Sequence, residues 1–190
     1  ETNVYRLVFA EGDGLPGLIM DFYNGTIVIQ CHSIGMHKVI DEFTESLKEI
    51  YGEKLNCIYD KSSDTLPKQA KYKSTDGYLF GKPETNEVLE YGNKFFIDWE
   101  NGQKTGFFID QRENRELVAQ FCKGKNVLNT FCYSGGFSVY AAKAGAALVH
   151  SVDSSGKAIE LTEKNILLNT ISNHQSFKED TFDFFNKRQS

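Results

Sequence analysis

Short apolar runs separated by turn-forming residues dominate the first half of the chain, a pattern typical of β-strands. Residues 4–9, 18–23 and 26–30 each fit a strand, and the last two runs are joined by Asn24-Gly25. Asn-Gly between two apolar runs is a strong signal for a two-residue hairpin turn. The sequence therefore predicts antiparallel strands at the start of the chain.

A helical period follows between Met36 and Tyr51. Its apolar positions recur every three or four residues, at Ile40, Phe43, Leu47 and Ile50. This spacing predicts an amphipathic helix whose outer face carries acidic side chains. Residues 61–75 are polar and are predicted to be irregular. Further strands are expected at residues 56–60, 78–80, 88–91 and 94–98.

From about Trp99 the pattern changes to strands and helices in alternation, which is typical of a parallel sheet. Strands are predicted at residues 127–131, where the strand should be buried, at 147–152, and from 176 onward. Helices are predicted at residues 139–144 and 157–170. The expected fold is α/β, with a Rossmann-like parallel sheet preceded by a smaller α+β domain with antiparallel strands. We place these two domains at residues 1–98 and 99–190, with the boundary near 98–104.

Two predicted helices of this second half have assigned core faces. Asp110 can cap a helix that turns Leu117, Val118 and Phe121 toward the core. The residues expected on the inner face of the helix at 157–170 are Ala158, Leu161, Asn165 and Leu168.

Charge and composition are those of an ordinary globular protein. The net charge is −5 over 190 residues. It is uneven, because residues 1–98 carry 10 Lys and Arg against 16 Asp and Glu, whereas residues 99–190 carry 11 against 10. Neither half has the strongly basic character of a stand-alone nucleic-acid binder. If the partner is RNA, much of the phosphate contact must come from outside this chain.

Membrane and metal sites are not indicated. No apolar run approaches the ~20 residues that span a bilayer, and the start of the chain lacks a signal-peptide pattern. The four cysteines form no C-x-x-C pair and no zinc-like spacing, so we expect reduced thiols in a cytoplasmic protein.

The candidate site begins at the glycine turn after the strand at 127–131. Gly135-Gly136 does not match the G-x-G-x-x-G pattern of dinucleotide sites, and the pair could simply allow close helix packing. Asp153 and Asp180 follow the next two strands, although each alone could be a helix cap or a turn residue. Because the carboxyl ends of parallel strands lie at the same edge of a sheet, we expect the glycine turn, Asp153 and Asp180 to lie close together at that edge. The set suits S-adenosylmethionine better than NAD, because nothing in it serves a pyrophosphate.

A second unusual stretch is Gln-Lys-Thr-Gly-Phe-Phe-Ile-Asp-Gln-Arg at residues 103–112. Its simplest interpretation is a loop, a short strand and a capped helix, with Phe107 and Phe108 in the core. Alternatively, Lys104, Asp110 and Arg112 could hold the carboxylate and ammonium of a methionine tail.

These motifs resemble one family. The stretch at 103–112, Val-Leu-Asn-Thr-Phe-Cys-Tyr-Ser-Gly-Gly-Phe-Ser-Val at 127–139 and Ser-Val-Asp-Ser-Ser at 151–155 are similar to the RlmI-like family. Its members are class I S-adenosylmethionine-dependent methyltransferases that form 5-methylcytosine in large-subunit (23S) ribosomal RNA. Residues 8–21 resemble the start of the family's central domain, so the resemblance covers nearly the whole chain.

The resemblance implies a set of cofactor contacts. Asp153 would hold the ribose, Ser154 would lie beside the adenosine, and Asp180 with Phe182 would contact the adenine. Phe108, Asp110 and Arg112 would close the methionine end. The residues implied to line the rest of the cofactor are Asn129, Phe131, Tyr133, Ser134, Gly135 and Gly136.

The resemblance also implies parts that this chain does not show. Family members carry an N-terminal RNA-binding PUA domain and, further on, an Asp-Pro-Pro motif with a catalytic cysteine that attacks carbon 6 of cytosine. We expect the chain to be a piece of a longer enzyme, able to bind cofactor but not to methylate. Cys132 is read as a small loop residue rather than the nucleophile, and Cys31, Cys57 and Cys122 as buried apolar side chains.

Within the class I sheet, the strand at 127–131 is central. Without neighbours on one side it would present an open, apolar edge, and we expect this edge to form a homodimer. Three alternatives stay open. They are a same-fold methyltransferase acting on another RNA base or a small molecule, a non-catalytic RNA- or ribosome-binding module and, more remotely, an NAD-dependent dehydrogenase.

Overall fold

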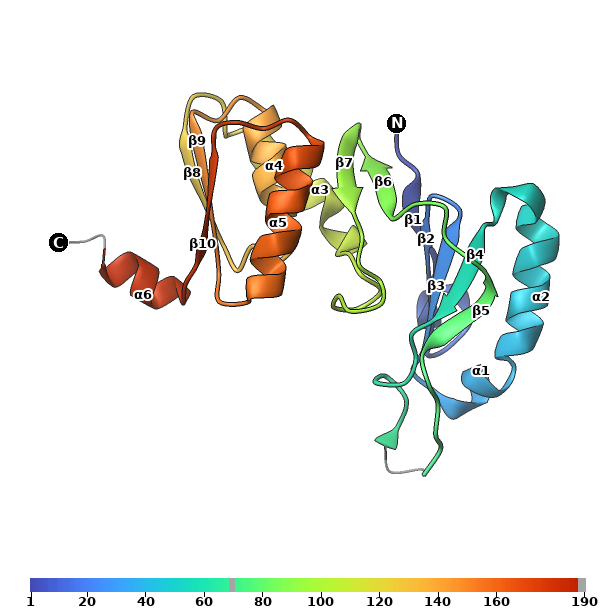
Figure 1. The fold of residues 1–190 in the computed structure, drawn as a ribbon. Helices are drawn as coiled ribbons and strands as arrows, with labels where there is room; N and C mark the ends of the chain where they lie inside the picture. The colour runs from blue at the N-terminus through green and yellow to red at the C-terminus, as the bar shows by residue number, and fades with distance from the viewer. Residues whose placement is uncertain (69–70, 188–190) are drawn as a thin grey trace. The chain divides into compact units, whose positions relative to one another are not determined.

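The computed structural model describes residues 1–68 and 71–187 (Figure 1). Contacts divide the chain into two compact units. Residues 1–89 and 97–109 form the first unit, and residues 90–96 join the chain from Asp110 onward in the second. The assignment of 1–98 and 99–190 as two domains stays a prediction.

The first unit contains a five-stranded sheet of order β1-β2-β3-β4-β5. Its strands are β1 (Val4–Phe9), β2 (Leu18–Tyr23), β3 (Thr26–Cys31), β4 (Cys57–Asp60) and β5 (Gly77–Gly81). Tyr23 pairs with Thr26 across Asn24-Gly25, which confirms the predicted hairpin. β3 and β4 run parallel, whereas the other pairs are antiparallel.

Helices α1 (Ile34–Lys38) and α2 (Ile40–Tyr51) form the crossover between β3 and β4 (Figure 1). The predicted helix is confirmed, although it begins earlier and is interrupted at Val39. Ile40 and Leu47 are buried against the sheet, as expected from their spacing. Ile50 is 74% exposed, so its predicted core position is wrong. It is the penultimate residue of α2 and does not belong to the hydrophobic core cluster of the unit. Two 3-10 helices, η1 (Ala10–Asp13) and η2 (Gly52–Lys54), complete the loops.

Residues between β4 and β5 are irregular over their described part, as predicted, and 69–70 lie outside the described residues. β6 (Glu87–Glu90) and β7 (Asn93–Phe96) follow as a two-stranded sheet. Tyr91 and Gly92 form the tight turn between β6 and β7, and their φ values of 49° and 75° suit such a turn.

The segment 97–109 is fixed within the first unit by its own side chains. Thr105 Oγ1 donates to the buried Asp21 at 2.5 Å and lies 2.8 Å from the Tyr23 hydroxyl. Gly106, at φ 116°, leaves no room for a Cβ, which would lie 2.9 Å from the Cα of Trp99. Phe107 is buried, as predicted. The short strand expected here is absent from the described chain, which instead forms the 3-10 turn η4 (Ile109–Gln111).

The second unit is built on a parallel sheet of order β10-β9-β8, which confirms the predicted α/β class. Its strands are β8 (Asn126–Thr130), β9 (Leu148–Asp153) and β10 (His174–Lys178). Its helices are α3 (Arg112–Ala119), α4 (Gly136–Lys143), α5 (Gly156–Leu168) and α6 (Thr181–Asn186). β8 lies at the edge of the described sheet, and Leu128 is 38% exposed, so the strand is less buried than its apolar sequence predicts.

Helix α3 differs from its prediction. Its N-cap is Gln111 rather than Asp110, and no side chain caps it. Leu117, Val118 and Phe121 are exposed by 53%, 39% and 72%, so the predicted core face is wrong. The helix instead buries Arg115, because a buried carboxylate pairs with it, as described below.

Helix α5 buries a slightly different face from the predicted one. Ala158 and Asn165 are buried as expected, whereas Leu161 and Leu168 are only half-buried. Ile159, Thr162 and Ile166 take the remaining inner positions. Ser155 caps the helix by accepting from the Ala158 amide at 3.4 Å. Among the described residues, no helix is long and apolar enough to cross a membrane.

Candidate functional site

The carboxyl edge of the parallel sheet gathers the segments that the sequence singles out. β8, β9 and β10 run in the same direction, so all three end at this edge. Loop 131–135 follows β8, Asp153 ends β9, and Asp180 stands two residues after β10. Open α/β sheets bind their ligands at this edge.

Loop 131–135 is held in a strained conformation. Phe131, Tyr133 and Gly135 have φ values of 56°, 47° and 71°, in the left-handed region. For Phe131 and Tyr133 this conformation costs about 1–2 kcal/mol each. Such strain is maintained only where neighbouring structure enforces it, and it concentrates at binding sites.

Helix α5 provides that enforcement. Thr162 Oγ1 donates to the Tyr133 carbonyl at 2.9 Å, and Asn165 Nδ2 donates to the Ser134 carbonyl at 2.8 Å. The other end of the fully buried Asn165 side chain accepts from the Phe96 amide at 2.7 Å. The loop is therefore fixed through its carbonyl groups from the helix side.

The two glycines of the turn meet protein atoms rather than open space. A Cβ on Gly135 would lie 2.7 Å from Thr162 Cγ2, and a Cβ on Gly136 would lie 3.1 Å from Arg115 Cδ. Close helix packing therefore accounts for the Gly-Gly pair. The parts of the turn that face outward are the exposed Phe131 ring, at 67% exposure, and the half-buried Tyr133.

Replacing Gly135 with alanine is expected to lower the free energy of unfolding by about 2–4 kcal/mol, because it adds left-handed strain to the overlap with Thr162. Gly124→Ala is the matched control, since Gly124 has φ 70° but no atom within 4 Å of its Cβ position. Urea denaturation should show a loss of only about 1–2 kcal/mol for the control. Equal losses for the two variants would contradict the packing role of Gly135.

Asp153 ties the end of β9 to this loop. Its Oδ2 accepts from the Tyr133 amide at 3.1 Å, and its Oδ1 accepts from the Ser155 amide at 2.9 Å. A carboxylate has about four acceptor positions, so each oxygen retains the capacity for a further donor. The half-buried carboxylate is thus held in one orientation at the sheet edge.

Asp180 caps helix α6. Its Oδ1 accepts from the amides of Phe182 and Asp183 at 2.8 and 3.2 Å, whereas among the described residues Oδ2 accepts none. Phe182 is 71% exposed. Phe131 and Phe182 therefore present exposed aromatic rings on the segments that follow β8 and β10. The predicted Ser154, next to Asp153, is also exposed.

A chain of hydrogen bonds runs across the helix-covered face of the sheet. Asn129 Nδ2 donates to Ser138 Oγ at 2.8 Å, and Ser138 Oγ lies 2.6 Å from Ser151 Oγ. Ser151 Oγ in turn lies 2.7 Å from His174 Nε2. The side-chain amide of Asn129 therefore forms a hydrogen bond with helix α4.

Burial, with the nearby His150, lowers the pKa of His174 to about 4. Because the folded chain binds this proton more weakly than the unfolded chain, stability is full above about pH 6.5 and falls as the pH drops toward 4. Urea denaturation at pH 7.5 and 5.5 should show this loss. The loss should be smaller in His174→Asn, and an unchanged pH dependence in that variant would contradict the assignment.

A buried ionic cluster lies behind the glycine turn, and the sequence interpretation missed it. Glu90 is fully buried and accepts from Arg115 Nε at 2.8 Å and from Arg112 Nε at 3.1 Å. The Tyr140 hydroxyl donates to Glu90 Oε1 at 3.0 Å. The one sequence feature that could have indicated this cluster is an acid at the end of an apolar run, in Val88-Leu89-Glu90. The arginine partners of Glu90 are 22 and 25 residues further along the chain, so the sequence does not show the pairing.

The stretch at 103–112 is divided between the units. Lys104 and Phe108 belong to the first, where Lys104 Nζ lies 4.3 Å from the centre of the Phe108 ring. Asp110 and Arg112 belong to the second, where Asp110 is exposed and Arg112 pairs with Glu90.

All four cysteines are buried. Burial raises the pKa of the Cys132 thiol to about 11, and its Sγ lies 3.5 Å from Thr162 Oγ1. The same cause raises the pKa values of Cys31, Cys57 and Cys122. Burial therefore favours the protonated thiols at neutral pH, whereas the thiolate is the reactive form. In the described part of the chain, no group of three acidic, histidine or cysteine side chains could hold a metal ion.

Comparison with known proteins gives the family. The model of the S-adenosylmethionine-dependent methyltransferase family matches residues 17–182. The chain belongs to this family. That match includes the carboxyl edge from Asn129 to Asp180, and the cofactor of the family is S-adenosylmethionine.

Individual methyltransferases extend the comparison. A protein from Aeromonas hydrophila named ribosomal RNA large subunit methyltransferase I is 42% identical over 184 residues, which cover 94% of this chain and 46% of that protein. The chain thus spans about half the length of the curated relatives that it matches. This agrees with the resemblance to large-subunit ribosomal RNA methyltransferases.

Solved methyltransferase structures confirm the predicted fold. One, described as an S-adenosylmethionine-dependent methyltransferase from Streptococcus mutans, superimposes with a TM-score of 0.85 at 27% identity. The match covers 99% of this chain and 49% of that one. A second structure, of a methyltransferase in complex with S-adenosylhomocysteine, also gives a TM-score of 0.85 at 27% identity, with 99% of this chain and 48% of that one covered.

Proposed function

We propose that this chain binds S-adenosylmethionine at the carboxyl edge of the sheet β10-β9-β8. The observation that carries the proposal is the oriented Asp153 carboxylate between two segments with exposed aromatic rings, Phe131 and Phe182. A carboxylate at the end of the second strand suits the two hydroxyls of a ribose. Exposed aromatic rings suit an adenine, because burial of a large apolar surface is favourable.

Further roles follow from chemistry. Asp180 is suited to accept from the adenine amino group through Oδ2. Tyr133, Ser134 and Gly135 of loop 131–135, together with Gly136 at the start of α4, would border the methionine end, where the N-terminus of the helix favours a carboxylate. Phe108, Asp110, Arg112, Asn129 and Ser154 remain proposed contacts on the strength of the family resemblance.

The proposed reaction is methyl transfer to carbon 5 of a cytosine in large-subunit ribosomal RNA. The bound cofactor supplies an electrophilic methyl group on its sulfonium. The described residues bind and orient it, and their buried, protonated cysteines supply no nucleophile for carbon 6 of the base. The name of the Aeromonas relative supports the RNA substrate, and the resemblance in the sequence supports cytosine. An RNA substrate also fits the cytoplasmic location predicted from the sequence.

Calorimetric titration of the chain with S-adenosylmethionine tests the binding proposal. We expect one site per chain with a Kd of roughly 1 μM to 1 mM, the range of typical KM values. S-adenosylhomocysteine should raise the melting temperature, because a ligand that binds the folded state stabilises it. Absence of both effects in a folded sample would contradict the proposal and favour a non-catalytic RNA-binding module.

The exposed apolar residues of this half lead to a second proposal, that the chain forms a homodimer. β8 is an edge strand among the described residues, and α3 and the residues after it expose Leu117, Val118 and Phe121. Unpaired strand edges and contiguous apolar surface favour association. Light scattering should give twice the chain mass, and Phe121→Glu should shift the species toward the monomer. A wild-type chain that stays monomeric at about 100 μM would contradict this proposal.

A further inference from the structure

A basic segment stands out in the acidic first unit. It lies between β4 and β5, in the described residues 61–68 and 71–76, which we call the lysine loop. Its residues 65–75 contain three lysines and no acid, whereas residues 1–98 as a whole carry a net charge of −6. The three lysines are Lys68, Lys71 and Lys73, and all three are exposed.

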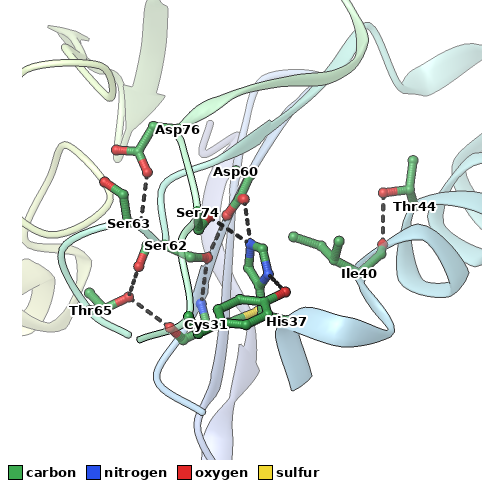
Figure 2. A network of polar contacts seen from close by, with 11 residues as sticks. Cys31, His37, Ile40, Thr44, Asp60, Ser62, Ser63, Thr65, Ser74 and Asp76 are labelled. Atoms are coloured by element: carbon green, nitrogen blue, oxygen red, sulfur yellow. Dashed lines mark hydrogen bonds and ion pairs between the residues drawn. The ribbon is translucent and has the colours of Figure 1, made fainter. Parts of the chain in front are cut away.

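The lysine loop is pinned to helix α1 by His37 (Figure 2). His37 Nδ1 lies 2.9 Å from the Tyr72 hydroxyl. Its Nε2 lies 2.9 Å from Asp60 Oδ2 and 3.0 Å from Ser74 Oγ. The Tyr72 ring also packs against the hydrophobic core of the unit. One imidazole therefore joins the helix, the end of β4 and the distal part of the loop.

The proximal part of the loop is fixed as well. Ser62 Oγ donates to Asp60 and accepts from the Cys31 amide at 2.9 Å. Thr65 Oγ1 donates to the Cys31 carbonyl at 2.7 Å, and Asp76 accepts from the Ser63 amide at 2.8 Å (Figure 2). Leu66 is buried in the core. Both ends of the loop are thus anchored by its uncharged side chains and its acids.

This anchoring separates the lysines by role. Lys61 turns inward, where its Nζ donates to the carbonyls of Trp99 and Gly102, the latter at 2.6 Å. Lys71 and Lys73 alternate with Tyr72 and Ser74, the two residues that contact His37. Because the anchors face inward, alternate lysines are left to the solvent. Among the described residues, the ion pairs of the first unit involve other side chains, so the charge of these lysines is presented to the solvent from an anchored loop.

We propose that the lysine loop binds the phosphate backbone of the RNA substrate. This proposal rests on the RNA substrate of the proposed function. Lysine ammonium groups bind phosphate as point charges and carry no base specificity, so the loop would position the RNA rather than read its sequence. Tyr72 and His37 are positioning residues. An RNA phosphate chain is the occupant that matches three exposed lysines close together in the sequence of an otherwise acidic unit.

Fluorescence anisotropy with a labelled, in vitro transcribed fragment of large-subunit ribosomal RNA tests the proposal across a range of KCl concentrations. Lys68→Gln/Lys71→Gln/Lys73→Gln is the test variant. Lys54→Gln/Lys82→Gln/Lys94→Gln removes the same charge from exposed sites outside the loop. We expect the test variant to bind at least about 10-fold more weakly at low salt. The slope of log K against log salt should become shallower by about 2, at about 0.7 per lost phosphate contact.

A further variant tests the anchor. Tyr72→Phe removes the hydroxyl that contacts His37 but keeps all lysines and the ring. It should weaken RNA binding several-fold with an unchanged salt slope, because the charges are kept but less well positioned. Circular dichroism checks that each variant is folded.

The outcomes separate this inference from the proposed function. Equal losses in the two triple variants, or no RNA binding by the wild-type chain, overturn the role of the loop. Calorimetry with S-adenosylmethionine on the same samples tests the proposed function independently, because the lysine changes should leave cofactor affinity within about twofold. Cofactor binding without a loop effect rejects only the inference. A loop effect without cofactor binding rejects only the methyltransferase site.

Discussion

Asp153→Asn is expected to weaken the binding of S-adenosylmethionine about 10- to 100-fold. The carboxylate is oriented by the amides of Tyr133 and Ser155, at 3.1 and 2.9 Å, and would accept from the ribose. Hydrogen bonds to charged groups contribute about 1.5–3 kcal/mol, which corresponds to this change in affinity. Isothermal titration calorimetry of wild type and variant measures it, with Asp183→Asn as a control at an exposed carboxylate of α6.

A cofactor analogue separates a ribose contact from a structural effect on the loop. In the wild type, 2′-deoxy-S-adenosylhomocysteine should bind more weakly than S-adenosylhomocysteine. In Asp153→Asn the two ligands should bind with nearly equal affinity, since the acceptor of the 2′-hydroxyl is altered. An undiminished difference between the ligands would show that Asp153 does not contact the ribose.

Arg115→Ala is expected to lower the free energy of unfolding by about 3–5 kcal/mol. Glu90 is fully buried, and removal of Arg115 takes away two charge-assisted hydrogen bonds, at 2.8 and 2.9 Å. Breaking a buried ion pair on one side is strongly destabilising, because the remaining charge is left poorly compensated. Urea denaturation monitored by circular dichroism measures the change.

Two further variants serve to interpret the result for Arg115→Ala. Glu116→Ala, at an exposed position of the same helix, should change stability by no more than about 0.5 kcal/mol. The double variant Glu90→Leu/Arg115→Leu should recover part of the lost stability, since it removes the buried carboxylate that Arg115→Ala leaves poorly compensated, while Arg112 loses its ion pair with Glu90. If Arg115→Ala behaved like Glu116→Ala, the cluster would contribute little.

Local signals in the sequence predicted much of the fold. Asn24-Gly25 specified its hairpin because both residues adopt positive φ, at 46° and 91°, as a two-residue turn of this kind requires. The strand that ends in Asp153 and the turn at Asp180 were also found, since each is a short apolar run followed by a polar cap. These features are determined by residues close together in the sequence, so they can be predicted without knowledge of the tertiary structure.

The errors have a common physical cause. Leu117 and Phe121 have the spacing of a core face, yet burial depends on what packs opposite, and the described chain buries Arg115 there instead. Ile50 keeps the helical period but stands at the end of α2, where it is exposed and outside the core cluster. The pairing of Glu90 with Arg115 joins residues 25 apart, and no periodicity encodes such a contact.

For the candidate site, the sequence predicted which segments meet but not what holds them. Asp153 and loop 131–135 come together at the sheet edge, as parallel strand order requires. The strain at Phe131 and Tyr133 and the clamp from Thr162 were not predictable, because they arise from packing against α5. For Gly135-Gly136 the structure confirms the alternative of close helix packing, whereas their contact with the cofactor stays a prediction.

The order in which the two units use the chain has a practical meaning for dissecting the protein. Residues 90–96 belong to the second unit and precede 97–109, which belong to the first. A single cut therefore cannot release both units intact. Cutting the chain at residue 98 would remove the hydrogen bond between Thr105 and Asp21. It would also expose Trp99 and Phe107, which are buried in the intact chain. Halves made this way should be insoluble unless they are coexpressed. A chain of residues 1–109 in which a short linker replaces residues 90–96 would keep all parts of the first unit.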